Sequence, residues 1–318
     1  MLRITTLITL ALIAIALPVA ANESSKVIFT TGFGYLAKYS LPNFTKVSLA
    51  SVGSFQPTTF AGVYDNAIYL RAADRGGLRV LVKVPISTFK PEVVRTFEGQ
   101  GDIKVNEFGF TADANWMTDK LRVYDATQSL ILDKKVDKLI GVSVANDGNW
   151  IVVSNHGYKV YGYETGKALL TVQLNDVLKV VADQSGSVAG LDSSLMLQSA
   201  HTKLTINTPG HLSALLLQKD SIWSAASAEP TCESPKSVIS HRNREGRLLS
   251  EITLDRKGSV YQMSIDRDGS VWVVMGECTG IALGRSYVIR IDSRLKHAQT
   301  MYAGGNPIQE VIFSNTRP

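Results

Sequence analysis

Residues 306–318 of the chain read NPIQEVIFSNTRP and predict a β-strand at residues 308–314. No strand follows it in the sequence. Its hydrophobic pattern and its polar turn match residues 260–269, VYQMSIDRDG. Unpaired backbone groups at a sheet edge promote aggregation, so we expect the partner of this strand to lie elsewhere in the chain.

Polar turns that end in tryptophan recur along the sequence. The segments DANW, DGNW, DSIW and the longer DGSVW contain all four tryptophans, which are Trp116, Trp150, Trp223 and Trp272. Each turn is predicted to follow one strand and to open the next, because Asp, Asn and Gly tolerate the positive φ of tight hairpins. We expect Trp150, Trp223 and Trp272 to occupy equivalent buried positions, since a repeated core needs a large side chain at one place.

A second hairpin follows each turn, so the repeat has four strands, a to d, in roughly 40 residues, the size of a propeller blade. Six blades follow one another from the second to the seventh, at residues 55–98, 102–137, 138–174, 175–209, 210–254 and 255–305. The third blade is the least regular, with a short strand b expected near residues 116–118. Merging or missing one repeat would give six or eight blades.

The first blade lacks an inner strand. Residues 26–32 match strand b, and residues 34–52 supply strands c and d. The strand at residues 308–314 would supply strand a. The sequence therefore predicts an all-β, seven-bladed β-propeller of four-stranded antiparallel blades, closed by the C-terminal strand joining the N-terminal blade.

Several turns resemble those of known propeller families. Residues 123–127, VYDAT, and 163–167, YETGK, are similar to turns of WD40-, YVTN- and quinoprotein-type repeats. Residues 268–274, DGSVWVV, resemble the streptogramin-lyase type. The resemblance covers essentially the whole mature chain and implies the propeller architecture. It implies no activity, because His297 of the seventh blade lies outside an acid–base cluster of the lyase kind.

Residues 1–21 have the pattern of a secretory signal peptide. Arg3 precedes an apolar run at residues 4–17, and Pro18 ends that run. The run is shorter than the roughly 20 residues that span a bilayer, which favours cleavage before Asn22 over an uncleaved anchor. We therefore expect a periplasmic or secreted protein without a membrane span after cleavage.

The mature length suits two average domains or one large β-domain, and the repeat favours a single propeller at residues 22–318. The formal charge of +5 is spread along the chain. The clusters DKKVDK (133–138) and HRNREGR (241–247) lack interleaved aromatic residues, so we interpret them as solvated turns rather than a nucleic-acid face. We expect a monomer that binds another exported protein or a small ligand.

No motif identifies catalysis. The five histidines have no paired metal-ligand spacing, and the chain has no G-x-S-x-G nucleophile elbow. The sequence therefore predicts no metal site and leaves the catalytic residues and any cofactor unknown.

The two cysteines suggest a working face. Cys232 and Cys278 lie between strands b and c of the sixth and seventh blades, in what we interpret as the longest b–c loops. In an exported protein they are expected to form a disulfide, and long loops on a rigid scaffold commonly carry binding residues. The candidates for this face are Arg71, Asp74, Arg75, His156, Asp192, Glu233, Glu277 and Arg285.

Three functions are compatible with these observations. The first is an exported, non-catalytic binding or scaffold propeller that acts through loops on one face. The second is a lyase- or lactonase-type enzyme with a polar site at the channel mouth. The third is a subunit of a periplasmic redox complex, suggested by the quinoprotein-like turns. We favour the first, although the fold alone does not choose among them.

Overall fold

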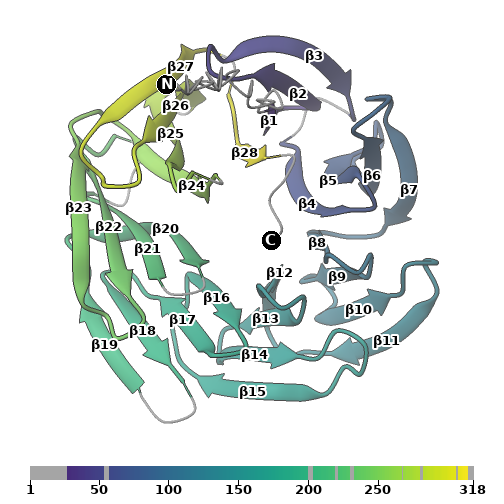
Figure 1. Ribbon diagram of the computed structural model, residues 1–318. Coiled ribbons are helices and arrows are strands. Elements are labelled where there is room, and N and C mark those ends of the chain that lie inside the picture. The colour runs from purple at the N-terminus through teal and green to yellow at the C-terminus, as the bar shows by residue number, and fades with distance from the viewer. Residues whose placement is uncertain are drawn as a thin grey trace, which may run out of the picture.

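A computed structural model describes residues 27–53, 57–199, 203–218, 221–229, 233–266, 268–279, 282–305 and 307–313. These residues form seven four-stranded antiparallel sheets, which Figure 1 shows arranged in a ring around a central opening. The predicted fold class and blade count are confirmed. The predicted signal peptide lies outside the described residues.

Six blades consist of four consecutive strands each, ordered a to d from the channel outward (Figure 1). Blade 2 contains β4 (Thr59–Tyr64), β5 (Ala67–Ala73), β6 (Arg79–Pro85) and β7 (Glu92–Phe97). Blade 3 contains β8 (Gly101–Val105), β9 (Thr111–Asn115), β10 (Lys120–Tyr124) and β11 (Leu130–Lys135). Blade 4 contains β12 (Leu139–Val144), β13 (Trp150–Ser154), β14 (Gly157–Tyr161) and β15 (Ala168–Gln173).

The remaining consecutive blades follow the same order. Blade 5 contains β16 (Lys179–Asp183), β17 (Gly186–Gly190), β18 (Ser194–Gln198) and β19 (Lys203–Asn207). Blade 6 contains β20 (His211–Gln218), β21 (Ser221–Ser227), β22 (Ser237–Asn243) and β23 (Leu248–Leu254). Blade 7 contains β24 (Ser259–Ile265), β25 (Val271–Thr279), β26 (Ala282–Ile291) and β27 (Ala298–Gly304).

Blade 1 combines the two ends of the described chain. It contains β28 (Glu310–Phe313), β1 (Val27–Thr31), β2 (Tyr35–Ser40) and β3 (Thr45–Ser51), in that order from the channel outward. β28 pairs antiparallel with β1 over four residues, from Ile28 opposite Phe313 to Thr31 opposite Glu310. The predicted closure of the ring is thus confirmed, and it places Ile308, Val311 and Ile312 in the core.

The ring has two faces. The connections from strand a to b and from c to d lie on one, called here the a–b face. The connections from b to c, and from d to the next blade, lie on the other, called the b–c face. The a–b hairpin of blade 2 reverses in a tight two-residue turn. The turn consists of Asp65 and Asn66, and both residues have a positive φ. Figure 1 looks along the channel through the ring.

The core lies between the blades. Successive residues of a strand point to opposite faces of its sheet, so each blade packs on both neighbours. Trp223 packs at the interface of blades 6 and 7, and Trp272 at that of blades 7 and 1. Trp150 packs instead against blade 3, toward the preceding neighbour. All three are buried as predicted, but the predicted equivalence fails for Trp150.

The position of each tryptophan after turns of equal length explains this difference. Ala145 donates to the carbonyl of Asn149 in blade 4, and Asp266 donates to that of Ser270 in blade 7. Trp150 is the first residue after this turn, whereas Trp272 is the second. A shift of one residue in a strand moves a side chain to the other face.

The prediction for Trp116 is wrong. Strand b of blade 3 is β9, not residues 116–118, and Trp116 lies in the turn after it with 38% of its surface exposed. The a–b turn of this blade is formed earlier, where Asn106 accepts from the backbone of Phe108 and Phe110. Asp113, interpreted from the sequence as a turn residue, is buried inside β9 and paired with Arg79 at 2.7 Å.

We predict that removing β28 opens the ring. A chain that ends at Gly305 should lose its single cooperative unfolding transition, because β1 would then have an unpaired inner edge. Thermal unfolding followed by circular dichroism measures this. The matched control ends at Phe313 and keeps β28, so it should melt cooperatively; two superimposable melting curves would contradict the closure.

We predict unequal costs for the tryptophans. W150A and W272A should each lower the free energy of unfolding by about 3–5 kcal/mol, the usual range for a large core side chain. W116A should change it by less than about 0.5 kcal/mol, because Trp116 is on the surface. Urea unfolding measures all three, and a large loss for W116A would show that the assigned register of blade 3 is wrong.

Candidate binding site

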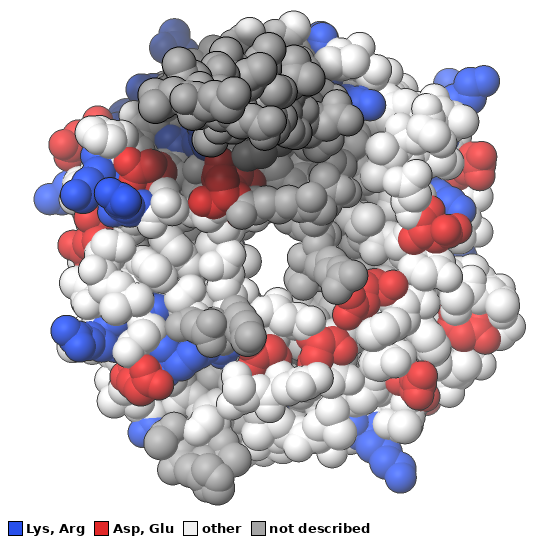
Figure 2. Space-filling model, viewed as in Figure 1, with Lys and Arg blue, Asp and Glu red and all other residues white. Residues whose placement is uncertain are grey.

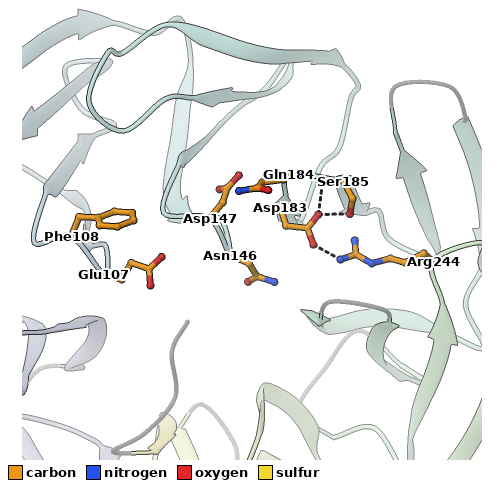
Figure 3. A pocket seen from close by; sticks show the side chains of 8 residues that line it. All are labelled: Glu107, Phe108, Asn146, Asp147, Asp183, Gln184, Ser185 and Arg244. Atoms are coloured by element: carbon orange, nitrogen blue, oxygen red, sulfur yellow. Dashed lines mark hydrogen bonds and ion pairs between the residues drawn. The ribbon is translucent and has the colours of Figure 1, made fainter.

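A hollow of about 650 Å³ opens on the a–b face beside the channel. The a–b turns of blades 3, 4 and 5 form most of its wall, and the c–d turn of blade 6 completes it. Figure 3 shows its eight lining residues: Glu107, Phe108, Asn146, Asp147, Asp183, Gln184, Ser185 and Arg244.

Asn106 fixes the wall that blade 3 contributes. Its buried side-chain carbonyl accepts from the amides of Phe108 and Phe110 at 3.1 and 3.0 Å. Its side-chain NH₂ donates to the carbonyl of Gly148 in the next turn at 3.0 Å. Gly148 has a φ of 81°, which the reversal of blade 4 requires. The turns of blades 3 and 4 are therefore held together.

An aromatic surface borders the hollow at Phe108. Its ring stacks on Tyr163 from the c–d turn of blade 4, with ring centroids 4.5 Å apart and planes at 14°. Phe108 is still 41% exposed. An exposed aromatic ring beside carboxylates can take part in cation–π contacts.

Asn146 connects the turns of blades 4, 5 and 6. Its backbone amide donates to the carbonyl of Ala182 at 2.9 Å, and its side chain donates to that of Leu217 at 3.0 Å. Next to it, Asp147 accepts from the amide of Asn149 at 3.2 Å through one carboxylate oxygen. These bonds restrict the motion of the acidic wall.

Asp183 and Arg244 form an ion pair in the wall of the hollow (Figure 3). One carboxylate oxygen of Asp183 accepts from the amide and the hydroxyl of Ser185 at 2.9 and 2.7 Å. The other accepts from Arg244, which also donates to the carbonyl of Gln218 at 2.9 Å. Burial acts to raise the pKa of Asp183, but the bonds from Ser185 and Arg244 outweigh it and hold that pKa below its usual value.

The hollow carries a net negative charge. Three carboxylates, from Glu107, Asp147 and Asp183, and one guanidinium, from Arg244, give −3 + 1, a formal −2. Figure 2 shows Asp and Glu side chains around the central opening of this face, with Lys and Arg mainly farther out. The surroundings therefore favour a cation at the mouth of the channel.

The inner strands carry a second set of charges. Glu310 accepts from the backbone amide of Phe60 and from the hydroxyl of Thr31. Lys104 donates to the carbonyl of Phe60 at 2.8 Å, and Lys179 of blade 5 reaches the carbonyl of Tyr261 in blade 7 at 3.3 Å. Burial raises the pKa of Glu310, and desolvation lowers that of Lys179. These contacts involve residues of five blades, which are blades 1, 2, 3, 5 and 7.

The residues predicted from the sequence lie toward the other face. Asp74 caps the b–c turn of blade 2 by accepting from the amide of Leu78 at 2.8 Å, and Arg71 and Arg75 lie near it in β5 and the turn. His156 contacts Asp137 at 3.4 Å in blade 4. Asp192 of blade 5 contacts His211 of blade 6 at 2.7 Å. The structure thus distributes these candidates over separate blades.

Blade 7 differs from the predicted long loop. β25 and β26 continue as a hairpin as far as Thr279 and Ala282, with Glu277 opposite Arg285. Glu277 also accepts from the hydroxyl of Tyr287 at 2.9 Å. The pairing of β25 with β26 therefore extends into the segment that was interpreted from the sequence as a loop.

The disulfide remains a prediction. Cys232 and the side chain of Cys278 lie outside the described residues. Glu233 follows Cys232 in the b–c connection of blade 6, on the same face as the blade 7 hairpin.

Sequence reasoning missed the residues of the acidic hollow. Asp147 and Asp183 belong to the recurring Asp of the a–b turns, which was interpreted only as a turn former. The sequence did contain a signal for this site, because an Asp recurs at the same position in successive blades. Equivalent turns of neighbouring blades lie at the same end of the channel, so such residues lie close together. Glu107 was hidden by the misplaced turn of blade 3.

The comparisons with known proteins agree with the fold. The sequence matches no protein-family model, and no curated protein matches it. Among solved structures, AztD of Citrobacter koseri is similar with a TM-score of 0.62 and 9% identity, over 91% of this chain and 98% of that one. A functionally unknown protein from Desulfotomaculum acetoxidans gives 0.61 and 11%, over 90% and 99%.

A third similar structure is the dihydro-heme d1 dehydrogenase NirN in complex with DHE. Its TM-score is 0.61 at 13% identity, over 92% of this chain and 66% of that one. Identities this low show the fold alone. The chain is a seven-bladed β-propeller.

A search of the described residues for a helix long and apolar enough to cross a membrane found none.

We predict that Asp183→Asn destabilises the protein in a pH-dependent way. A carboxylate with a lowered folded-state pKa contributes stability above its unfolded pKa of about 3.9, and loses it as the pH falls through the folded value. The variant should therefore melt at a lower temperature than wild type at pH 7, and the difference should shrink below about pH 4. The exposed Asp176→Asn is the control. A difference that is constant from pH 3 to 7 would contradict the role of the charge.

Proposed function

We propose that this chain is an exported, non-catalytic binding propeller that takes a basic segment of another exported protein at the mouth of its a–b face. One observation carries the proposal: a hollow of formal charge −2 in which the carboxylates of Asp147 and Asp183 are held by turn hydrogen bonds. Fixed acceptors lose little freedom when a cation binds, so such a site is preorganised.

The size and composition of the hollow support a protein side chain as its occupant. A volume of about 650 Å³ can admit a Lys or Arg side chain with its neighbours. Phe108 offers a ring face to a cation, and the carboxylates of Glu107 and Asp147 offer charge. Long apolar stems of Lys and Arg can pack on the ring while their heads reach the acids.

The two alternative functions, a propeller enzyme and a redox subunit, require groups that a binding protein does not need. A lyase or lactonase would need a general base or a metal ion at the mouth, and a redox subunit would need a chromophore. The similarity to a heme d1 dehydrogenase supports only the shared fold. A stoichiometric metal ion or an absorbing cofactor in the purified protein would favour these alternatives over a binding protein.

The proposed site can be tested with defined peptides. Isothermal titration with tetra-lysine should show saturable binding, and tetra-glutamate should show none. Glu107→Gln combined with Asp147→Asn should weaken binding of tetra-lysine at least tenfold and reduce its dependence on salt, because two charges are lost at constant shape. The matched control changes two exposed carboxylates of the other face, Asp176→Asn with Asp255→Asn. Equal effects of the two double variants would refute the site.

A cross-linking experiment identifies the partner. A photoreactive phenylalanine analogue at position 108 should capture one exported protein from the living cell, and the adduct should be lost in the Glu107→Gln, Asp147→Asn background. The same analogue at Leu130, exposed on the outer strand of blade 3, is the control. Capture at position 130 alone would place the interface on the rim.

Export and the disulfide are part of this proposal. Mass spectrometry of unreduced protein from the exported fraction should give a chain that begins at Asn22 and lacks two hydrogens, with Cys232 joined to Cys278. Closing a loop of about 45 residues contributes roughly 3–4 kcal/mol in the chain-entropy model. Two free thiols would refute the bridge without affecting the acidic site.

A further inference from the structure

A second hollow, of about 320 Å³, lies between blades 3 and 4. The end of β11 forms one wall, and the face of blade 4 that points toward blade 3 forms the other. Its polar lining differs from that of the channel mouth, because it contains Lys134, Lys135, Lys159 and His156 and one acid, Asp137.

The hollow exists because the interface between blades 3 and 4 is apolar in one part and polar in another. Leu121, Leu139 and Trp150, from strands c, a and b, fill part of the space between blades 3 and 4. The row that runs outward across blade 4 from strand b to strand d reads Val152, Lys159 and Thr171 in register, and only Val152 is buried. Two polar residues therefore stand where apolar residues would close the gap.

Lys134 is held in position at this site. It lies opposite Leu121 in the sheet, on the side of blade 3 that faces blade 4, and its ammonium is 4.8 Å from the ring centre of buried Tyr161. A cation–π contact of this kind contributes about 0.5–1 kcal/mol at a partly exposed site. The aromatic ring of Tyr161 thus favours a position of the Lys134 ammonium inside the hollow over a fully solvated position.

The positive charge is not neutralised by the nearby acids. Asp133 points to the other side of β11, where it contacts Arg122 at 3.2 Å and Lys120 at 3.8 Å. Asp137 contacts His156 at 3.4 Å. Three lysines and one aspartate give +3 − 1, a formal +2 with the histidine neutral.

We propose that this hollow is a second binding site, for a small ligand that carries a phosphate or sulfate group. Lys134 and Lys159, on its two walls, bind the anionic oxygens, and Val152 with the ring of Tyr161 forms an apolar floor. The volume falls within the range of about 300–1,000 Å³ of small-molecule pockets. The site goes beyond the proposed function, because its charge is opposite to that of the channel mouth and its walls come from other strands.

The site is tested by nuclear magnetic resonance titration of the full mature chain with three probes: glucose 6-phosphate, glucose 6-sulfate and glucose. Both anionic sugars should cause saturable shifts of backbone amides at residues 134, 157 and 159, and glucose should cause none. Inorganic phosphate alone should shift the same amides more weakly, since it lacks the sugar that contacts the floor. A response to only one of the two anionic sugars assigns the site to that group.

The variant Lys134→Gln with Lys159→Gln should raise the dissociation constant for the anionic sugars at least tenfold. The matched control, Lys46→Gln with Lys203→Gln, removes two exposed lysines from the outer strands of blades 1 and 5 and should leave it unchanged. Melting curves show whether each variant is folded. Shifts scattered over many surface lysines, equal effects of both variants, or no saturable shift with any anionic probe would overturn the proposal.

Discussion

Backbone pairing between β28 and β1 is the contact on which the rest of the ring depends. Four residues of β28 complete blade 1, and their side chains and backbone connect it to both neighbours. Gln262 of blade 7 donates to the carbonyl of Val311 at 3.1 Å and accepts from its amide at 3.1 Å. Glu310 accepts from the amide of Phe60 in blade 2. One short strand therefore joins three blades, and each turn at the mouth keeps its place relative to the next.

Polar contacts between blades complement this pairing. Arg79 of blade 2 and Asp113 of blade 3 form a buried ion pair, and Arg79 also donates to the carbonyls of Glu98 and Gly99. Burial raises the pKa of Asp113, and the guanidinium opposes that shift. A buried pair of this kind adds little net stability compared with apolar residues, but loss of either partner leaves an uncompensated charge. The pair thus fixes how blade 3 meets blade 2, next to the connection between β7 and β8.

The fold could be predicted from the sequence because hairpin turns and strand patterns are local. Blade boundaries and the closing strand followed from repetition alone. The faces of single residues could not be obtained in this way, as Trp150 and Trp116 show, because a displacement of one residue along a strand moves a side chain to the other face of the sheet. The binding hollow was missed for a related reason. Asp147 and Asp183 lie far apart in sequence from Arg244, and only the circular arrangement brings them together.

The separation of the two strands in blade 1 affects the order of folding. Blades 2 to 7 are made of consecutive strands, and each can form as soon as its own residues have left the ribosome. Thr31 and Glu310, which meet in blade 1, are 279 residues apart. Bringing such distant segments together costs on the order of 5 kcal/mol in chain entropy, and contacts of long sequence separation form slowly. β1 therefore waits for β28, and until then β1 is an open edge that another chain can occupy.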